Sequence, residues 1–219
     1  TFFGKKYSQR RLDKVCFISK AKMDVYKREV CIERNIDTSN LVVAYWGSEF
    51  VYFPIKEQTE GASKRVIVSC STVQDLKRVN MIAEAVSLIG RDDLEWYHFG
   101  DGPLMNDLKE RISKYDTRVR KRIHLLGRRD NLEVKEFYAS HNVDLFINVS
   151  TTEGLPISVM EAMSYSIPVL VTDVGGEREI VDHGENGYIV PVDISSTDLA
   201  KCIESHLDKE ASCLYKMRD

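Results

Sequence analysis

Short β-branched or aromatic runs alternate with helix-like segments along most of the 219-residue chain, and this alternation restricts the fold more than any other feature. Strands are predicted at residues 15–19, 41–46, 65–70, 94–99, 122–126, 144–149, 169–172 and 187–190. Helices are predicted at residues 20–35, 80–89, 104–114, 133–140, 157–166 and 197–207. Most of the strands are nearly continuous apolar runs, which is typical of strands covered on both faces. The pattern predicts an α/β fold, a doubly wound parallel sheet with helices on both faces.

The predicted elements divide unevenly along the chain. At about 150 residues per domain, 219 residues correspond to about one and a half domains. Residues 65–207 hold six of the strands and are predicted to form the doubly wound domain. Residues 1–54 hold two strands and one helix, which is too little to fold alone, and are interpreted as the incomplete end of a preceding domain. The polar residues 55–64 are interpreted as the linker, and residues 208–219 as a C-terminal helix or tail.

Composition and charge exclude several classes of protein. With 43% hydrophobic and 30% charged residues, the chain has the composition of a soluble globular protein. Its formal net charge of -3 argues against a strongly basic nucleic-acid-binding protein, and no nucleic-acid partner is expected. The cluster Arg118, Arg120, Lys121 and Arg122 has no interleaved aromatic residues, so it is interpreted as a solvated face.

The cysteine pattern and the lack of long apolar runs indicate a cytoplasmic protein. Five cysteines are widely spaced without a C-x-x-C pair, which favours reduced thiols over a disulfide framework. The sequence has no signal-peptide pattern and no apolar run near the ~20 residues of a membrane span. These observations leave one form of membrane contact open, which is peripheral association of the full-length protein with the inner face of the cell membrane.

The strongest candidate site is the segment Ser150-Thr-Thr-Glu153-Gly-Leu-Pro156-Ile-Ser-Val-Met-Glu161. It follows a predicted strand, and open parallel sheets bind ligands beyond the carboxyl ends of their strands. Gly154 permits a close backbone approach, and Pro156 is expected as the first residue of the next helix. The N–H groups of that first turn can bind an anion, and carboxylates suit the hydroxyls of a sugar. A solvated pair of glutamates near a helix start is the alternative.

Several motifs occur together in one order. Glu153 and Glu161, with seven residues between them, are followed by Ala162-Met163, Ile167-Pro168-Val169 and Val174-Gly175-Gly176. Phe99-Gly-Asp-Gly-Pro103 and His124-Leu-Leu-Gly127 precede them, and Tyr45-Trp-Gly with Phe53-Pro54 lies further upstream. In this order the chain resembles the retaining glycosyltransferases of family 4, which have the GT-B architecture of two Rossmann-like domains. The resemblance covers residues 40–207 and implies that residues 65–207 are the C-terminal, nucleotide-sugar-binding half. Residues 1–54 would then be the end of the N-terminal acceptor domain.

The resemblance also implies roles by position. The implied catalytic residues are Glu153, which faces the transferred sugar, and Lys77, which stabilises the departing diphosphate. The implied donor-binding residues are Glu161 for the ribose, the backbone of Gly154, Leu155 and Pro156 for the diphosphate and sugar, and Gly127 and Arg128 for the base. The family usually has an arginine shortly after the strand that ends at Cys70, where this chain has Ser71-Thr72. Arg78 is the candidate replacement, because a guanidinium binds phosphate well, and a surface Lys-Arg pair is the alternative.

Neither a metal nor another cofactor is expected. The chain has no Asp-x-Asp to clamp a metal–diphosphate complex, and its five histidines lack ligand spacing. Fixed cations would then neutralise the leaving group.

These expectations combine into one function. The chain is predicted to bind a nucleotide-diphosphate sugar. In the full-length protein it would transfer a hexose, with retention, to a saccharide or lipid-linked acceptor hydroxyl in polysaccharide or glycoconjugate synthesis. Residues 1–219 alone are expected to bind the donor but to transfer little or nothing. The alternatives are a non-catalytic nucleotide-sugar-binding module, which Ser71-Thr72 favours, and a GT-B sugar-nucleotide epimerase.

Overall fold

Six parallel strands form the central sheet of the computed structural model, which describes residues 14–33, 37–45, 47 and 64–208. The strands are β3 (Arg65–Cys70), β4 (Leu94–Phe99), β5 (Ile123–Gly127), β6 (Leu145–Asn148), β7 (Val169–Thr172) and β8 (Gly187–Val190). Their order is β5-β4-β3-β6-β7-β8, so the chain starts in the centre, moves to one edge and returns to add β6 beside β3. The order reverses between β3 and β6, and open parallel sheets bind ligands at such a switch point.

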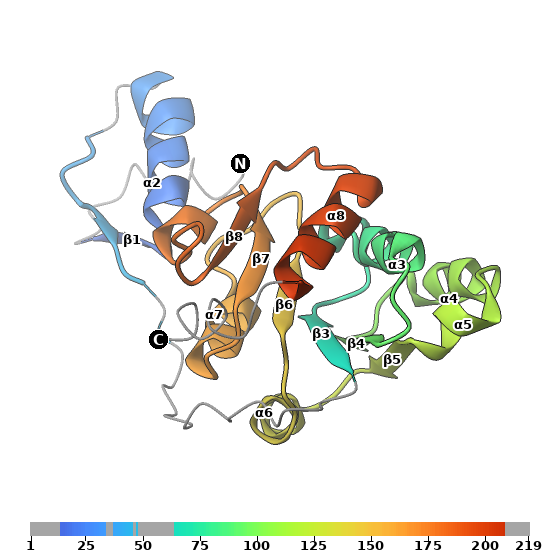
Figure 1. Cartoon of the computed structure of the whole chain (residues 1–219). Coiled ribbons are helices and arrows are strands. Elements are labelled where there is room, and N and C mark those ends of the chain that lie inside the picture. Colours follow the sequence, from blue (N-terminus) through green and yellow to red (C-terminus); the bar gives the residue numbers. More distant parts are fainter. Residues whose placement is uncertain (1–13, 34–36, 46, 48–63, 209–219) are drawn as a thin grey trace.

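Helices cover both faces of this sheet, which confirms the predicted α/β fold (Figure 1). The first face is covered by α3 (Val79–Leu88), α4 (Met105–Ser113) and α8 (Ser196–Leu207), and the second by α6 (Asn131–Ser140) and α7 (Ile157–Ser164). Ile67 and Leu145 point to the first face, while the adjacent Val68 and Phe146 point to the second. Because successive side chains of a strand alternate between faces, strands buried on both sides have apolar residues at most positions.

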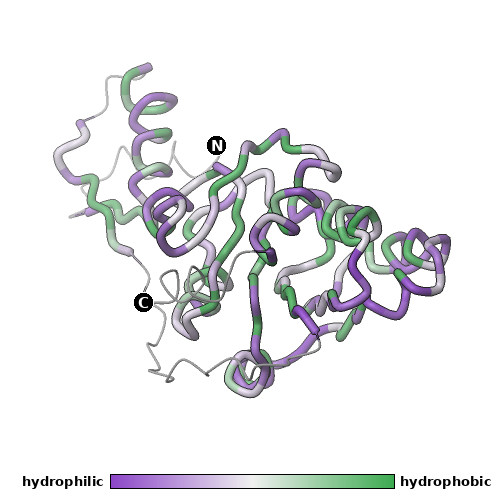
Figure 2. The backbone as a smooth tube through the Cα atoms, viewed as in Figure 1, coloured by the Kyte–Doolittle hydropathy of each residue, from purple (hydrophilic) through white to green (hydrophobic). Residues whose placement is uncertain are grey.

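The distribution of hydropathy follows this layering. In Figure 2 hydrophobic residues are concentrated along β8 and in α3, which pack into the core, whereas α4 and α5 (Thr117–Lys121) at one end of the molecule are mainly hydrophilic. None of the helices among the described residues is long and apolar enough to cross a membrane.

The described N-terminal residues form a separate small unit. Two parallel strands, β1 (Val15–Phe17) and β2 (Leu41–Val43), pair with each other and not with the six-stranded sheet. Between them the chain forms α2 (Lys20–Tyr26), which continues as the π-helical segment η1 (Lys27–Ile32), so the predicted helix at residues 20–35 is present but changes its winding. Residues 34–36, Trp46 and most of the predicted linker and tail lie outside the described residues.

Glu179 joins this unit to the main domain. It belongs to η3 (Glu177–Glu179), a short 3-10 helix after β7, and accepts hydrogen bonds from the backbone N–H groups of Lys20 and Ala21 at 2.8 and 2.9 Å. Its carboxylate also accepts a hydrogen bond from the hydroxyl of Tyr45 at 2.8 Å. A carboxylate on the free N–H groups of a helix start is favourable, so the carboxylate caps α2 from another part of the chain.

Three short helices, η2 (Asp75–Lys77), α5 and η3, are absent from the sequence prediction. Each has five residues or fewer, which is too short for an apolar periodicity to show.

The interpretation of the basic cluster at residues 118–122 as a solvated face is wrong for one of its residues, Arg122. Arg118, Arg120 and Lys121 are exposed, but Arg122 is buried and donates to the backbone carbonyls of Val86, Ile89 and Arg91. The end of α3 has carbonyls without intrahelical partners, and the Arg122 guanidinium satisfies them.

Candidate functional site

An ion pair lies at the switch point of the sheet. Lys77 ends η2 after β3, and Glu153 lies in the loop after β6, with 2.5 Å between Lys77 Nζ and Glu153 Oε1. Asn148, at the end of β6, also donates to Glu153 Oε1 at 3.1 Å. The two loops are joined by a backbone hydrogen bond from Thr151 N to Leu76 O at 2.8 Å. The structure thus brings the two predicted catalytic residues together, although they are 76 positions apart in the sequence.

Glu153 is held as a carboxylate in a largely buried position. Burial alone raises the pKa of this carboxyl, but hydrogen bonds from Lys77, Ser150 and Asn148, together with the Lys77 charge, lower the pKa below its ordinary value. Glu153 is therefore ionised at neutral pH and neutralises much of the positive charge of Lys77.

A second carboxyl group at this position, Glu177, is absent from the predicted site. It is 1% exposed, and Asn148 Nδ2 lies 3.4 Å from its Oε1, so one amide contacts both carboxyl groups. Glu177 Oε2 has no hydrogen-bond partner among the described residues. Burial and then the charge of Glu153 raise the pKa of Glu177 to about 9, despite the opposing effect of Lys77. Glu177 therefore holds a proton at neutral pH. The Gly175-Gly176 motif marks this loop in the sequence, but nothing in the sequence shows that the Glu177 side chain is buried.

Gly175 allows the loop after β7 to approach the Glu153 loop. It has a φ of +58°, and a Cβ at this position would lie 2.1 Å from the carbonyl oxygen of Glu153. Gly176 N donates to Gly154 O at 2.8 Å, so the two loops are bonded through their backbones. Glycine is required here both by the left-handed conformation and by the close approach.

We expect Gly175→Ala to lower the free energy of unfolding by about 2 kcal/mol, because it adds a clash to the strain of a left-handed alanine. Gly184→Ala is the matched control. Gly184 is also left-handed, with a φ of +89°, but nothing lies within 4 Å of its Cβ position, so only about 1 kcal/mol is expected. Urea unfolding of both variants measures the difference. Equal losses would show that the Glu153 carbonyl does not restrict this position.

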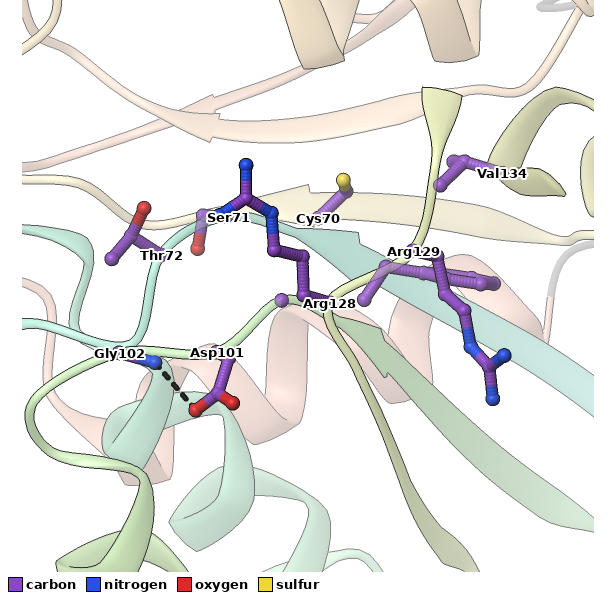
Figure 3. A pocket seen from close by; sticks show the side chains of 10 residues that line it. Cys70, Ser71, Thr72, Asp101, Gly102, Arg128, Arg129 and Val134 are labelled. Atoms are coloured by element: carbon purple, nitrogen blue, oxygen red, sulfur yellow. Dashed lines mark hydrogen bonds between the residues drawn. The ribbon is translucent and has the colours of Figure 1, made fainter. Parts of the chain in front are cut away.

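A cavity of about 550 Å³ opens beyond the carboxyl ends of β3, β4 and β5. It is lined by Cys70, Ser71, Thr72, Phe99, Gly100, Asp101, Gly102, Arg128, Arg129 and Val134 (Figure 3). A Cβ at Gly102 would lie 2.4 Å from the carbonyl oxygen of Val73, so the 99–103 motif forms a turn packed against the chain that follows β3.

Glu161 lies beside this cavity. It belongs to α7 and accepts a hydrogen bond from Asn131 Nδ2, at the start of α6, at 2.7 Å. Burial and, next, the charge of Glu161 raise the pKa of the Cys70 thiol to about 11, and Cys70 is part of the cavity wall. The predicted ribose-binding carboxylate is thus close to the cavity, while the ion pair of Lys77 and Glu153 lies at the adjacent switch point. Asn131 is not among the predicted site residues, although it ends the loop 127–131, which follows a predicted strand and so lies at the edge of the sheet where a ligand is expected.

One of the three predicted backbone positions, Pro156, differs from expectation. Pro156 is the N-cap of α7 and not its first helical residue, because its ψ of 108° is extended. Its carbonyl oxygen accepts hydrogen bonds from the N–H groups of Val159 and Met160 at 3.2 Å each. Of the other two backbone positions, Leu155 is buried, and a Cβ at Gly154 would lie 2.6 Å from Ile18 Cδ1. Gly154 therefore fits closely against the N-terminal unit.

The guanidinium of Arg78 is engaged by the backbone. Its Nε donates to Val149 O and its Nη1 to Val192 O, each at 2.6 Å, and its Nη2 is buried without a partner among the described residues. Arg78 thereby joins the loops after β6 and β8. It would have to leave these carbonyls to bind a phosphate fully, and its role on phosphate stays a prediction.

Among the described residues, no group of three or more His, Cys, Asp or Glu side chains is arranged to hold a metal ion. The expectation of a metal-independent site stays a prediction.

Comparison with known proteins gives one family. The model of the family described as glycosyl transferases group 1 matches residues 54–218. The O-antigen biosynthesis glycosyltransferase WbnH of Escherichia coli is 35% identical over 114 residues, which cover 52% of this chain and 30% of that protein. The N-acetyl-alpha-D-glucosaminyl L-malate synthase of Bacillus anthracis is 28% identical over 156 residues, which cover 71% of this chain and 39% of that protein. The chain thus spans about a third of the length of these relatives.

Solved structures have the same fold. Alr3699/HepE of Anabaena in complex with UDP superposes with a TM-score of 0.74 at 21% identity, covering 94% of this chain and 57% of that one. At this level of identity the likeness concerns the fold.

Proposed function

Because this chain belongs to the glycosyl transferases group 1 family and has the fold of one GT-B half, we propose that it binds the nucleotide-sugar donor of a glycosyltransferase. This proposal rests on the order in which the candidate binding groups lie along the edge of the sheet. We assign the cavity to the base, the nearby Glu161 to the ribose, and the Lys77–Glu153 pair at the adjacent switch point to the diphosphate and the sugar. The Anabaena relative is bound to UDP, which makes UDP the first ligand to test.

The proposed reaction is transfer of a hexose to a saccharide or lipid-linked hydroxyl, with retention as in family 4. Names of relatives in O-antigen biosynthesis support a role in polysaccharide synthesis. Residues 1–54 would be the end of the acceptor domain and residues 55–64 the linker, so residues 1–219 alone would bind the donor and transfer little. We further propose a metal-independent, cytoplasmic reaction, with peripheral association of the full-length protein at the inner membrane face.

A non-catalytic nucleotide-sugar-binding module is the second candidate. It is favoured by the neutralisation of Lys77 by Glu153 and by the engagement of Arg78 with backbone carbonyls, which leave less free positive charge for a leaving group. Donor hydrolysis or transfer by the full-length protein separates the two functions, because a binding module does neither.

The site is tested by nucleotide binding with and without Glu161. Glu161→Ala should lower the affinity for UDP about tenfold, because charge-assisted hydrogen bonds to the ribose are lost. Thermal shift with UDP, GDP, ADP, CDP and TDP selects the nucleotide, and calorimetric titration gives the affinity. Glu136→Ala, an exposed glutamate on α6, is the control and should bind like the wild type. Unchanged affinity of Glu161→Ala for every nucleotide would rule out Glu161 as a ribose-binding residue.

A further inference from the structure

We propose that the Arg128 side chain binds the phosphates of the nucleotide at the edge of the cavity, next to Ser71. This inference rests on the proposed donor-binding function and gives the side chain a role different from the backbone contact with the base that the sequence implied for its loop.

The other cations at the site are already engaged. A nucleoside diphosphate brings at least two negative charges, which need fixed positive charges near them. Lys77 is paired with Glu153 at 2.5 Å, and Arg78 donates from two of its nitrogens to the carbonyl oxygens of Val149 and Val192. Lys77 therefore shares its charge with Glu153, and Arg78 is held by backbone carbonyls, so a diphosphate needs a further cation beside Lys77.

The charge of Arg128 is not neutralised by a carboxylate among the described residues. Among the residues that the structure describes, no carboxylate lies within ion-pair distance of its guanidinium. The adjacent Arg129, in contrast, lies 3.4 Å from Glu133 and donates to the carbonyl oxygen of Leu126. Two neighbouring arginines in one loop therefore differ in whether their charge is already neutralised.

The Arg128 side chain also points into the site. In Figure 3 Arg128 extends from the end of β5 toward Ser71 and Cys70, which line the same cavity, whereas Arg129 points the opposite way. Ser71 and Thr72 begin the segment that leads from β3 to Lys77. Ser71 lines the cavity and begins the segment that ends at Lys77, so the Arg128 guanidinium beside Ser71 is positioned to contact phosphates that extend from the cavity toward Lys77.

The test compares ligands that differ only in phosphate. UDP and UMP are titrated by calorimetry, and uridine by ligand-observed NMR, which measures millimolar affinities. Arg128→Ala should lower the affinity for UDP about tenfold and leave that for uridine within twofold, because a charge-assisted contact is lost only with the phosphates. Arg128→Lys should keep part of the affinity, and the loss should shrink at high salt, where exposed charges are screened. Arg129→Ala is the matched control and should bind UDP like the wild type.

The outcomes separate this inference from the proposed function. If the wild type binds none of the five nucleoside diphosphates, the proposed function fails. If it binds UDP but Arg128→Ala binds UDP equally well, the proposed function stands and this inference is overturned. If Arg128→Ala weakens uridine and UDP by the same factor, the guanidinium acts on the base, and the inference is overturned as well.

Discussion

Replacing Lys77 with alanine should lower the affinity of the chain for UDP by about 100-fold. A charge-assisted hydrogen bond to phosphate contributes about 1.5 to 3 kcal/mol, and 1.4 kcal/mol is tenfold in affinity. The substitution also leaves Glu153, whose side chain is 10% exposed, as a carboxylate without its cation beside the bound diphosphate. Both effects weaken the binding of UDP and neither weakens the binding of uridine, so calorimetry with UDP and ligand-observed NMR with uridine measure the loss.

Two further variants define the cause of that loss. Lys201→Ala removes the same charge from an exposed pair with Asp198 on α8 and should leave UDP binding unchanged. Adding Glu153→Gln to Lys77→Ala removes the unpaired carboxylate and should restore about tenfold of the affinity. A thermal melt verifies that each variant is folded. UDP binding by Lys77→Ala within threefold of the wild type would rule out Lys77 as a phosphate-binding group.

The sheet could be predicted because its physical cause is local. Each of the six strands is covered on both faces, so most of the apolar runs are nearly continuous and show in the sequence. The predicted start of β5 is wrong by one residue for a clear reason: Arg122 adjoins the strand, but its guanidinium turns back to the carbonyls at the end of α3. Because this contact joins two separate segments of the chain, the pattern within either segment does not predict it.

The site could be predicted only in part, for the same reason. Glu153, Glu161 and Lys77 belong to motifs that can be found along the chain, and the structure places them at one edge of the sheet. The engagement of Arg78 depends on Val192, which lies 114 positions away after β8. The burial of Glu177 depends on how closely two glycine-containing loops approach each other. These are properties of tertiary packing, and they decide which charges remain available to a ligand.

The buried carboxyl of Glu177 should make the stability of the protein decrease with pH. The pKa is about 9 in the folded chain and about 4.5 in an unfolded one, so between these values the folded state holds a proton that the unfolded state has lost. The free energy of unfolding therefore falls as pH rises from about 4.5 to about 9, by about 1.4 kcal/mol per pH unit from this group, and is level outside this range. By pH 7 the loss amounts to about 3 kcal/mol.

Glu177→Gln should remove this loss, because an amide resembles the protonated acid in shape and does not ionise. Relative to the wild type, the variant should gain about 3 kcal/mol of unfolding free energy between pH 4.5 and pH 7, measured by urea unfolding at both pH values. The shift of Glu153 has the opposite sign: its stabilising contribution is present above about pH 4.5 and is lost as pH falls through its lowered pKa. The contribution of Glu153 therefore changes only below about pH 4.5, and it is the same in the wild type and in Glu177→Gln.

Glu179→Gln is the matched control, two residues away on the same 3-10 helix. The pKa of Glu179 is lowered, because hydrogen bonds from Ala21, Lys20 and Tyr45 outweigh the effect of its burial. Its stabilising contribution as a carboxylate is therefore fully present above about pH 5, so Glu179→Gln should lower stability by the same amount at pH 5, 7 and 8.5. The two substitutions thus have opposite signs, and only that of Glu177 varies with pH. If the difference between Glu177→Gln and the wild type were constant over this range, Glu177 would be ionised in the folded protein, and the site would hold two carboxylates against one lysine.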